Sequence, residues 1–142
     1  MFQVSTRTQY AIRALVHLAN FGTTCSARIA KAQHISPKYL EGILGQLKSA
    51  GLVISGRGRQ GGYRLAKDPA EVSMIEVVHA TEGDVRPVDC VDDSTVCAMG
   101  LLCSPRRFWL GLKETVDTYL SSVTLGDLAE ESRPEDHPSK GE

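Results

Sequence analysis

The feature that most constrains the fold is an amphipathic helix followed directly by a glycine-rich hairpin, within residues 36–65. Ser36 is a preferred helix N-cap, and Pro37 suits the first helical position, which needs no N–H partner. The apolar residues that follow recur at spacings of three and four and are expected in the core: Leu40, Ile43, Leu44 and Leu47. The opposite face includes Gly42 and Gly45. A face made this small can approach another surface closely, such as a groove.

The predicted hairpin pairs residues 52–54 with residues 63–65 through a tip that contains four glycines. Arg57, Arg59 and Arg64 make this hairpin basic, which suits the narrow, electronegative minor groove of DNA. No Gly-Lys-Ser/Thr sequence follows, so a phosphate-binding P-loop is excluded. A short helix over residues 26–32 precedes the amphipathic helix, which completes a helix-turn-helix pattern. We therefore predict a mainly α fold, a winged helix-turn-helix with a small β-hairpin wing.

Further helices are expected over residues 6–21, 74–81 and 105–122. Ser73 and Glu76 form a capping box for the second of these, and Ser104 is the expected N-cap of the third. The third helix has a broad apolar face suited to pairing two copies of the chain. We divide the chain into a DNA-binding domain (1–67), a connecting helix and cysteine loop (68–103), a dimerisation helix with a short terminal turn (104–128), and a disordered acidic tail (129–142).

Charge is distributed very unevenly. Residues 1–67 contain ten Lys and Arg but one acid, Glu41, whereas residues 68–142 contain six Lys and Arg against sixteen acids. A basic half with almost no acids is typical of a surface that binds nucleic-acid phosphates. The sequence has no apolar run long enough to span a bilayer and no secretory signal pattern, so we expect a cytoplasmic protein without a membrane partner.

Three of the four cysteines lie close together, at Cys90, Cys97 and Cys103. Their gaps of six and five residues do not match the paired knuckles of a zinc site. By spacing alone an iron–sulfur cluster, a thiol redox switch, a zinc site and no chemistry all remain open, with the cluster favoured. Cys25 is expected to be a small, semi-buried residue. The chain shows no Cys-x-x-Cys and no nucleophile–base pair, so we do not expect an enzyme.

Several stretches together resemble the Rrf-type family of winged-helix regulators, which includes the iron–sulfur repressors IscR and NsrR. They are residues 10–15 (YAIRAL), 35–44 (ISPKYLEGIL), 50–53 (AGLV), 57–65 (RGRQGGYRL), 80–83 (ATEG), the three cysteines, and 123–128 (VTLGDL). The resemblance implies a homodimer whose long C-terminal helices cross, bound to a palindromic operator in double-stranded DNA. It also implies that Glu41 contacts cytosine edges and that Arg57 reaches the minor groove. The remaining DNA-binding residues that we assign are Ser36, Lys38, Tyr39, Arg59, Gln60 and Arg64.

The resemblance further implies that Cys90, Cys97 and Cys103 hold an iron–sulfur cluster, 2Fe–2S being favoured over 4Fe–4S. The fourth ligand does not carry over, because Arg106 stands where some relatives have histidine and Gln9 where others have aspartate. Gln9, Asp92, Asp93 or an exchangeable small ligand could complete the site. The expected function is a homodimeric DNA-binding repressor that senses iron–sulfur status, redox state or nitric oxide. The alternative is a cluster-free family member that switches by thiol oxidation or small-molecule binding.

Overall fold

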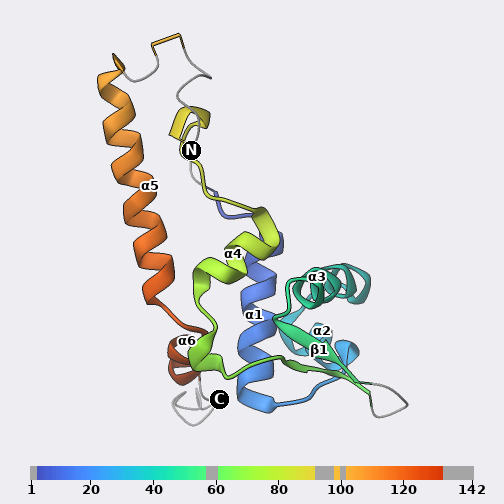
Figure 1. Cartoon of the computed structure of the whole chain (residues 1–142). Coiled ribbons are helices and arrows are strands. Elements are labelled where there is room, and N and C mark those ends of the chain that lie inside the picture. The colour runs from blue at the N-terminus through green and yellow to red at the C-terminus, as the bar shows by residue number, and fades with distance from the viewer. Residues whose placement is uncertain (1–2, 57–60, 92–97, 100–101, 133–142) are drawn as a thin grey trace, which may run out of the picture.

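The computed structural model describes residues 3–56, 61–91, 98–99 and 102–132 of the 142-residue chain. Its elements are, in order, α1 (Thr6–Phe21), α2 (Ser26–Gln33), α3 (Pro37–Ser49), β1 (Val53–Ser55), β2 (Tyr63–Leu65), η1 (Pro69–Glu71), α4 (Met74–Glu82), η2 (Asp89–Val91), α5 (Ser104–Ser122) and α6 (Leu125–Glu131). The predicted fold class, mainly helical with a two-stranded hairpin, is confirmed. Figure 1 shows α1 at the centre of one compact part, with α5 standing beside it as a long rod.

The core forms where α1 packs against the helix-turn-helix. Ala11, Ala14 and Leu15 of α1 are fully buried, and the predicted apolar face of α3 meets them. That face is fully buried at all four expected positions: Leu40, Ile43, Leu44 and Leu47. Burial of this kind stabilises a domain by about 1.5–3 kcal/mol for each large apolar side chain. The helix-turn-helix is therefore fixed to α1 through one shared core.

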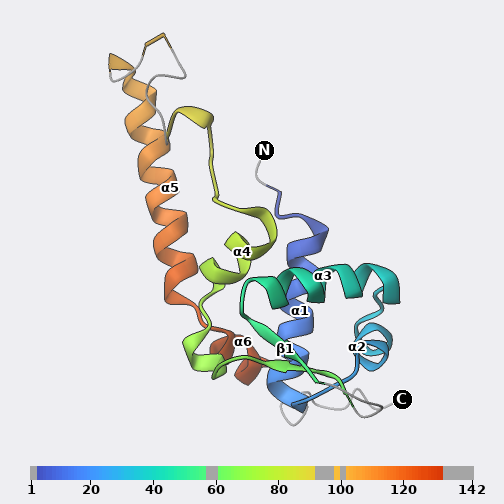
Figure 2. The same cartoon turned by 45° about the vertical axis from the view of Figure 1, so that its right-hand side comes forward.

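The wing is an antiparallel pair in which Val53 faces Leu65 and Ser55 faces Tyr63. Its base is joined to the loop between α1 and α2, because Thr24 and Tyr63 exchange two backbone hydrogen bonds of 3.0 and 2.9 Å. Gly62 permits this approach, since a Cβ there would lie 2.8 Å from the carbonyl carbon and oxygen of Thr24. The hairpin thus leaves the domain in a defined direction beside α2 and α3 (Figure 2).

The segment that follows α5 returns to the compact part. Leu125 of α6 is fully buried in the same core as α1, and its N–H donates to the carbonyl of Val72 at 2.7 Å. Met74 N–H donates in turn to the carbonyl of Val123 at 2.9 Å. The two ends of α5 are therefore attached differently, one through α6 to the core and the other through η2.

Some element boundaries differ from the sequence prediction. The expected N-cap Ser104 is the first helical residue of α5, and Cys103 occupies the cap position. At α2, Cys25 occupies the cap position before Ser26. The boundary drawn after residue 128 falls inside α6, because Ala129 is only 8% exposed and the helix continues to Glu131. Residues 133–142, the rest of the predicted tail, lie outside the described residues. In the described part of the chain, no helix combines the length and apolarity needed to cross a bilayer.

Candidate nucleic-acid interface and cysteine site

The start of α3 is arranged as the sequence predicted. The Ser36 hydroxyl accepts a hydrogen bond from the Tyr39 backbone N–H at 3.2 Å and thereby caps the helix. Lys38 and Glu41 are exposed on the next turn. A Cβ built on Gly42 or Gly45 would meet nothing within 4 Å, so packing within the protein does not require glycine there. The exposed face of α3 is therefore shallow and open to an external surface.

The wing is held relative to α3 by a contact that the sequence did not reveal. Lys48, in the last turn of α3, donates from Nζ to the Ser55 hydroxyl at the end of β1, at 2.7 Å. Arg64, a predicted DNA-binding residue, is exposed on β2 opposite Ile54. The other predicted wing residues, Arg57, Arg59 and Gln60, lie outside the described residues. The structure thus shows the base of the wing on the same side as the end of α3.

A second set of side-chain contacts that the sequence did not reveal joins α1 to α3. Arg7 Nη1 donates to Gln46 Oε1 at 2.9 Å, and the Arg7 guanidinium lies 5.9 Å from the centre of the Tyr39 ring. Tyr39 also meets Tyr10 edge to face, with ring centres 5.9 Å apart. Arg7 and Gln46 are 39 residues apart, so no local pattern could have paired them.

Two of the three clustered cysteines are described, and both are half-buried free thiols. Cys90 lies in η2, and Cys103 is the N-cap of α5. Arg106 joins the two segments: its Nε donates to the Cys90 carbonyl at 3.0 Å, and its backbone N–H donates to the Cys103 carbonyl at 3.2 Å. Cys97 lies outside the described residues. Cys25, predicted to be semi-buried, is exposed at the N-cap of α2.

Of the suggested fourth ligands, only Gln9 is described. Its side chain is exposed, and its Nε2 donates to the Val4 carbonyl at 3.0 Å. Asp92 and Asp93 fall within residues 92–97, outside the described part of the chain. Arg106 cannot ligate a metal because its guanidinium stays protonated. Its described role is to hold the Cys90 backbone.

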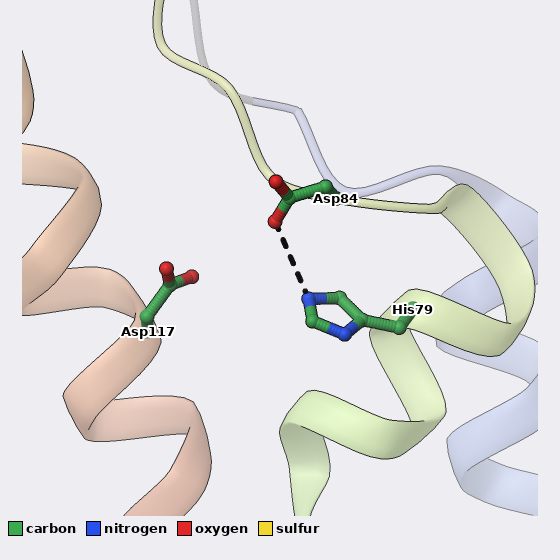
Figure 3. Close-up of side chains that lie close together, drawn as sticks. All are labelled: His79, Asp84 and Asp117. Carbon is green, nitrogen blue, oxygen red and sulfur yellow. Dashed lines mark ion pairs between the residues drawn. The ribbon is translucent and has the colours of Figure 1, made fainter. Parts of the chain in front are cut away.

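A third cluster lies between α4 and α5. His79 Nε2 is 3.5 Å from Asp84 Oδ1, and Asp117 faces this pair from α5 (Figure 3). Ligand atoms of these three side chains lie within 4.8 Å of one another, a spacing that a metal ion would require. The position of a cation is taken by Lys113, whose Nζ lies 3.0 Å from Asp84 Oδ1 and 2.9 Å from Asp117 Oδ2. This arrangement is an ion-pair network that contains its own cation.

Hydrogen bonding shifts the titration of this network. Contact with Lys113 holds the pKa of Asp84 below its ordinary value, and contact with Asp117, then Asp84, raises the pKa of Lys113. Lys113 also donates to the Val85 carbonyl at 3.3 Å. All three acceptors are thus engaged by one ammonium, which joins α5 to the segment that leaves α4.

Comparison with known proteins identifies the family. Residues 4–131 match the Rrf2 model, described as an iron-dependent transcriptional regulator. The regulator CymR of Bacillus subtilis is 32% identical over 130 residues, which cover 89% of this chain and 89% of CymR. IscR of Photobacterium profundum is 32% identical over 129 residues, which cover 89% of this chain and 74% of IscR.

Solved structures agree with this assignment. The structure of CymR, the global cysteine regulator of B. subtilis, superposes with a TM-score of 0.78 at 31% identity, covering 93% of this chain and 99% of CymR. The structure of T. potens IscR superposes with a TM-score of 0.76 at 28% identity, covering 96% and 93% of the two chains. These relatives are transcriptional regulators, so the expectation that the chain is not an enzyme is confirmed. The chain belongs to the Rrf2 family of winged-helix, DNA-binding transcriptional regulators.

Proposed function

We propose that this regulator is a homodimeric repressor whose affinity for a palindromic operator depends on an iron–sulfur cluster, 2Fe–2S being favoured, held by Cys90, Cys97 and Cys103. The DNA-binding part is residues 1–67, and residues 104–122 join two copies. The segment that bears the cysteines lies between these parts in the sequence. A change there could alter how the two DNA-binding parts are placed.

The DNA interface rests on the exposed face of α3 and the neighbouring wing. Lys38 supplies charge for phosphates, while Glu41 can accept a hydrogen bond from the cytosine amino group in a major groove. The open space around Gly42 and Gly45 permits the close approach that base reading needs. Ser36 and Tyr39 lie at the helix start, where backbone contacts are common.

The observation that carries the cluster proposal is the Arg106 bond to the Cys90 carbonyl. It ties η2 to the first turn of α5, so the segments bearing Cys90 and Cys103 are held together. Both thiols are unpaired and half-buried, which suits soft thiolate ligands for iron. When bound, the cluster would supply a centre that responds to oxidants and nitric oxide.

Anaerobic reconstitution with iron and sulfide tests the cluster. The wild type should show visible charge-transfer absorption and bind iron and sulfide in fixed proportion, and Cys97→Ser should lose both. Cys25→Ser is the matched control, because Cys25 is exposed at the N-cap of α2, a helix that lies apart from α5 (Figures 1 and 2). Iron binding that survives Cys97→Ser at full stoichiometry would overturn the three-thiolate site.

A cluster-free thiol switch is the second candidate. Staphylococcus aureus CymR has a solved oxidised form that superposes with a TM-score of 0.70 at 27% identity. Here Cys90 and Cys103 remain free thiols on segments that Arg106 joins. Intact-mass analysis after mild oxidation of iron-free protein separates the candidates: a reversible loss of two hydrogens, accompanied by changed operator affinity, supports the thiol switch.

A further inference from the structure

We infer that Arg7, in the first turn of α1, is a positioning residue for sequence reading. It fixes the rotation of α3 about its own axis, and therefore the direction in which Glu41 faces a groove. This inference rests on the proposed DNA interface and adds a residue outside the helix-turn-helix and the wing.

The geometry is a clamp across two helical turns. Arg7 donates from Nη1 to Gln46 at 2.9 Å and lies with its guanidinium 5.9 Å from the centre of the Tyr39 ring. Tyr39 and Gln46 are seven residues apart, so they lie on one side of α3, two turns from each other. A contact at one turn fixes only a distance, whereas contacts at two turns resist both tilt and rotation.

The contacts continue along α1 and reach the other helix of the helix-turn-helix. Tyr10 supports Tyr39 edge to face, with the ring planes at 79°. The Arg13 guanidinium lies 5.3 Å from the centre of the Tyr10 ring, and its Nε donates to Gln33 Oε1 in α2 at 3.2 Å. Guanidinium groups and rings thus alternate along α1, which holds α3 near its start and α2 near its middle. Cation–π contacts of this kind are weak at exposed sites, strong enough to favour one orientation of a helix but not to decide folding.

A phosphate contact is the competing role for a basic residue near a recognition helix. In Arg7, however, Nη1 is engaged by Gln46 and the planar group is directed to Tyr39. Both contacts need the guanidinium, because lysine provides a compact charge without the planar fork. A phosphate contact would depend mainly on the positive charge, which lysine keeps, and it would contribute to the salt dependence of binding. Arginine-to-lysine exchange therefore separates the two roles.

The test uses the full chain and a duplex selected from a random library by the wild-type protein, beside a scrambled duplex of the same length. Arg7→Lys should reduce the ratio of selected to scrambled affinity by about tenfold, a loss within the range for one misread base pair. Affinity for the scrambled duplex and its salt dependence should not change. Gln46→Ala should cause a similar loss, and the double variant should lose little more, because both changes release one clamp.

Three outcomes would overturn the inference. In one, Arg7→Lys binds like the wild type while Arg7→Ala lowers the salt slope by about one, which identifies a phosphate contact. In another, Gln46→Ala is folded by circular dichroism and keeps full selectivity. Folding is expected to be preserved, because alanine raises the helix propensity at this position. If the wild type selects no sequence at all, sequence reading itself is refuted, and the clamp with it.

Discussion

At the scale of single residues, the start of α1 depends on a carboxylate from another helix. The Thr8 hydroxyl is fully buried and lies 2.7 Å from the Thr81 hydroxyl and 2.8 Å from Glu82 Oε1. Glu82 also accepts a hydrogen bond from the Ser5 backbone N–H. These contacts, with Ser5 the largest cause, hold the pKa of Glu82 below its ordinary value of 4.5. The end of α4 therefore satisfies donors at the positive end of α1.

Glu82→Gln should therefore make stability less sensitive to acid. Because the pKa of Glu82 is lowered by folding, its contribution is present above the ordinary value and is lost as the pH falls through the folded value. At pH 7 the free energy of unfolding of the variant should be lower by about 0.5–1 kcal/mol, a small loss because the side chain is exposed. In acid the variant should approach the stability of the wild type. Urea unfolding at several pH values measures this. Glu130→Gln replaces another exposed carboxylate and should change the stability little at any pH. Equal pH profiles of stability for the wild type and Glu82→Gln would contradict the proposed cap.

Glu41→Ala addresses base reading at a single position. If Glu41 accepts a hydrogen bond from cytosine, its removal should relax selectivity at that base pair by about 1–3 kcal/mol. Affinity for unrelated DNA should stay the same or rise, because a negative charge is removed. Lys38→Ala provides the contrast, since it should weaken binding to all duplexes and lower the salt slope. A Glu41→Ala variant with unchanged base preference in competition titrations would exclude this role.

The local signals predicted residues whose roles are set by their neighbours in sequence. Ser36 and Pro37 begin α3 as expected, since capping is governed within one turn. The contacts of Arg7 with Gln46 and of Lys113 with Asp84 were not predictable. They join residues 39 and 29 positions apart, so they depend on how helices are placed in space.

At the scale of elements, Lys113 joins α5 to the segment that leads to Cys90. Its side chain is only 17% exposed, and its ammonium contacts Asp84, Asp117 and the Val85 carbonyl. Asp117 Oδ1 is buried and has no hydrogen-bond partner among the described residues, so its carboxylate depends on Lys113. None of the α5 residues is buried, which makes this network one of the main attachments of the helix.

Lys113→Met should loosen α5 while keeping side-chain volume. Removing the ammonium leaves the carboxylates of Asp84 and Asp117 facing each other, and we expect the free energy of unfolding to fall by about 1–2 kcal/mol. Because the pKa of Lys113 is raised, its contribution to stability is present below the ordinary value of 10.5 and is lost as the pH rises above it. Because the pKa of Asp84 is lowered, its contribution to stability is lost in acid, below the ordinary value of 3.8. The difference in stability from the wild type should thus shrink in strong acid and in strong base.

Hydrogen exchange of α5 amides measures the loosening directly. Lys67→Met is the matched control: it breaks the pair of Lys67 with Glu76, whose side chains are 36% and 39% exposed, so a smaller loss is expected. Equal exchange in α5 for both variants would show that Lys113 does not hold the helix.

Element prediction succeeded where periodicity and caps agree. The helix predicted over residues 6–21 and the strand predicted over residues 63–65 match α1 and β2. The terminal turn was predicted too short, because α6 is stabilised by burying Leu125 and Ala129 against distant segments. Periodicity over so few residues is a weak signal, and tertiary burial decides the length. For the cysteine site, spacing left several chemistries open, and the bond from Arg106 to Cys90 could not be foreseen.

At the scale of the whole molecule, α5 carries a long apolar stripe that the other described residues do not cover. Phe108 is 65% exposed and Tyr119 is 68% exposed. They are eleven residues apart, three turns of helix, and half-buried Leu112 lies on the same side between them. Exposed aromatic residues aligned along one helix are typical of an interface. Because α5 stands beside the compact part (Figures 1 and 2), a second copy could reach this stripe without disturbing the DNA-binding part.

The double variant Phe108→Glu with Tyr119→Glu should therefore be monomeric. Two carboxylates on the stripe would have to be desolvated in a dimer, which costs more than the contacts return. Sedimentation should show a wild-type dimer and a folded monomeric variant, since neither side chain is buried in the single chain. Operator affinity should fall steeply, because a monomer engages one half-site only. Ser121→Glu adds charge on another side of α5 and should remain dimeric. A double variant that still sediments as a dimer would place the interface elsewhere.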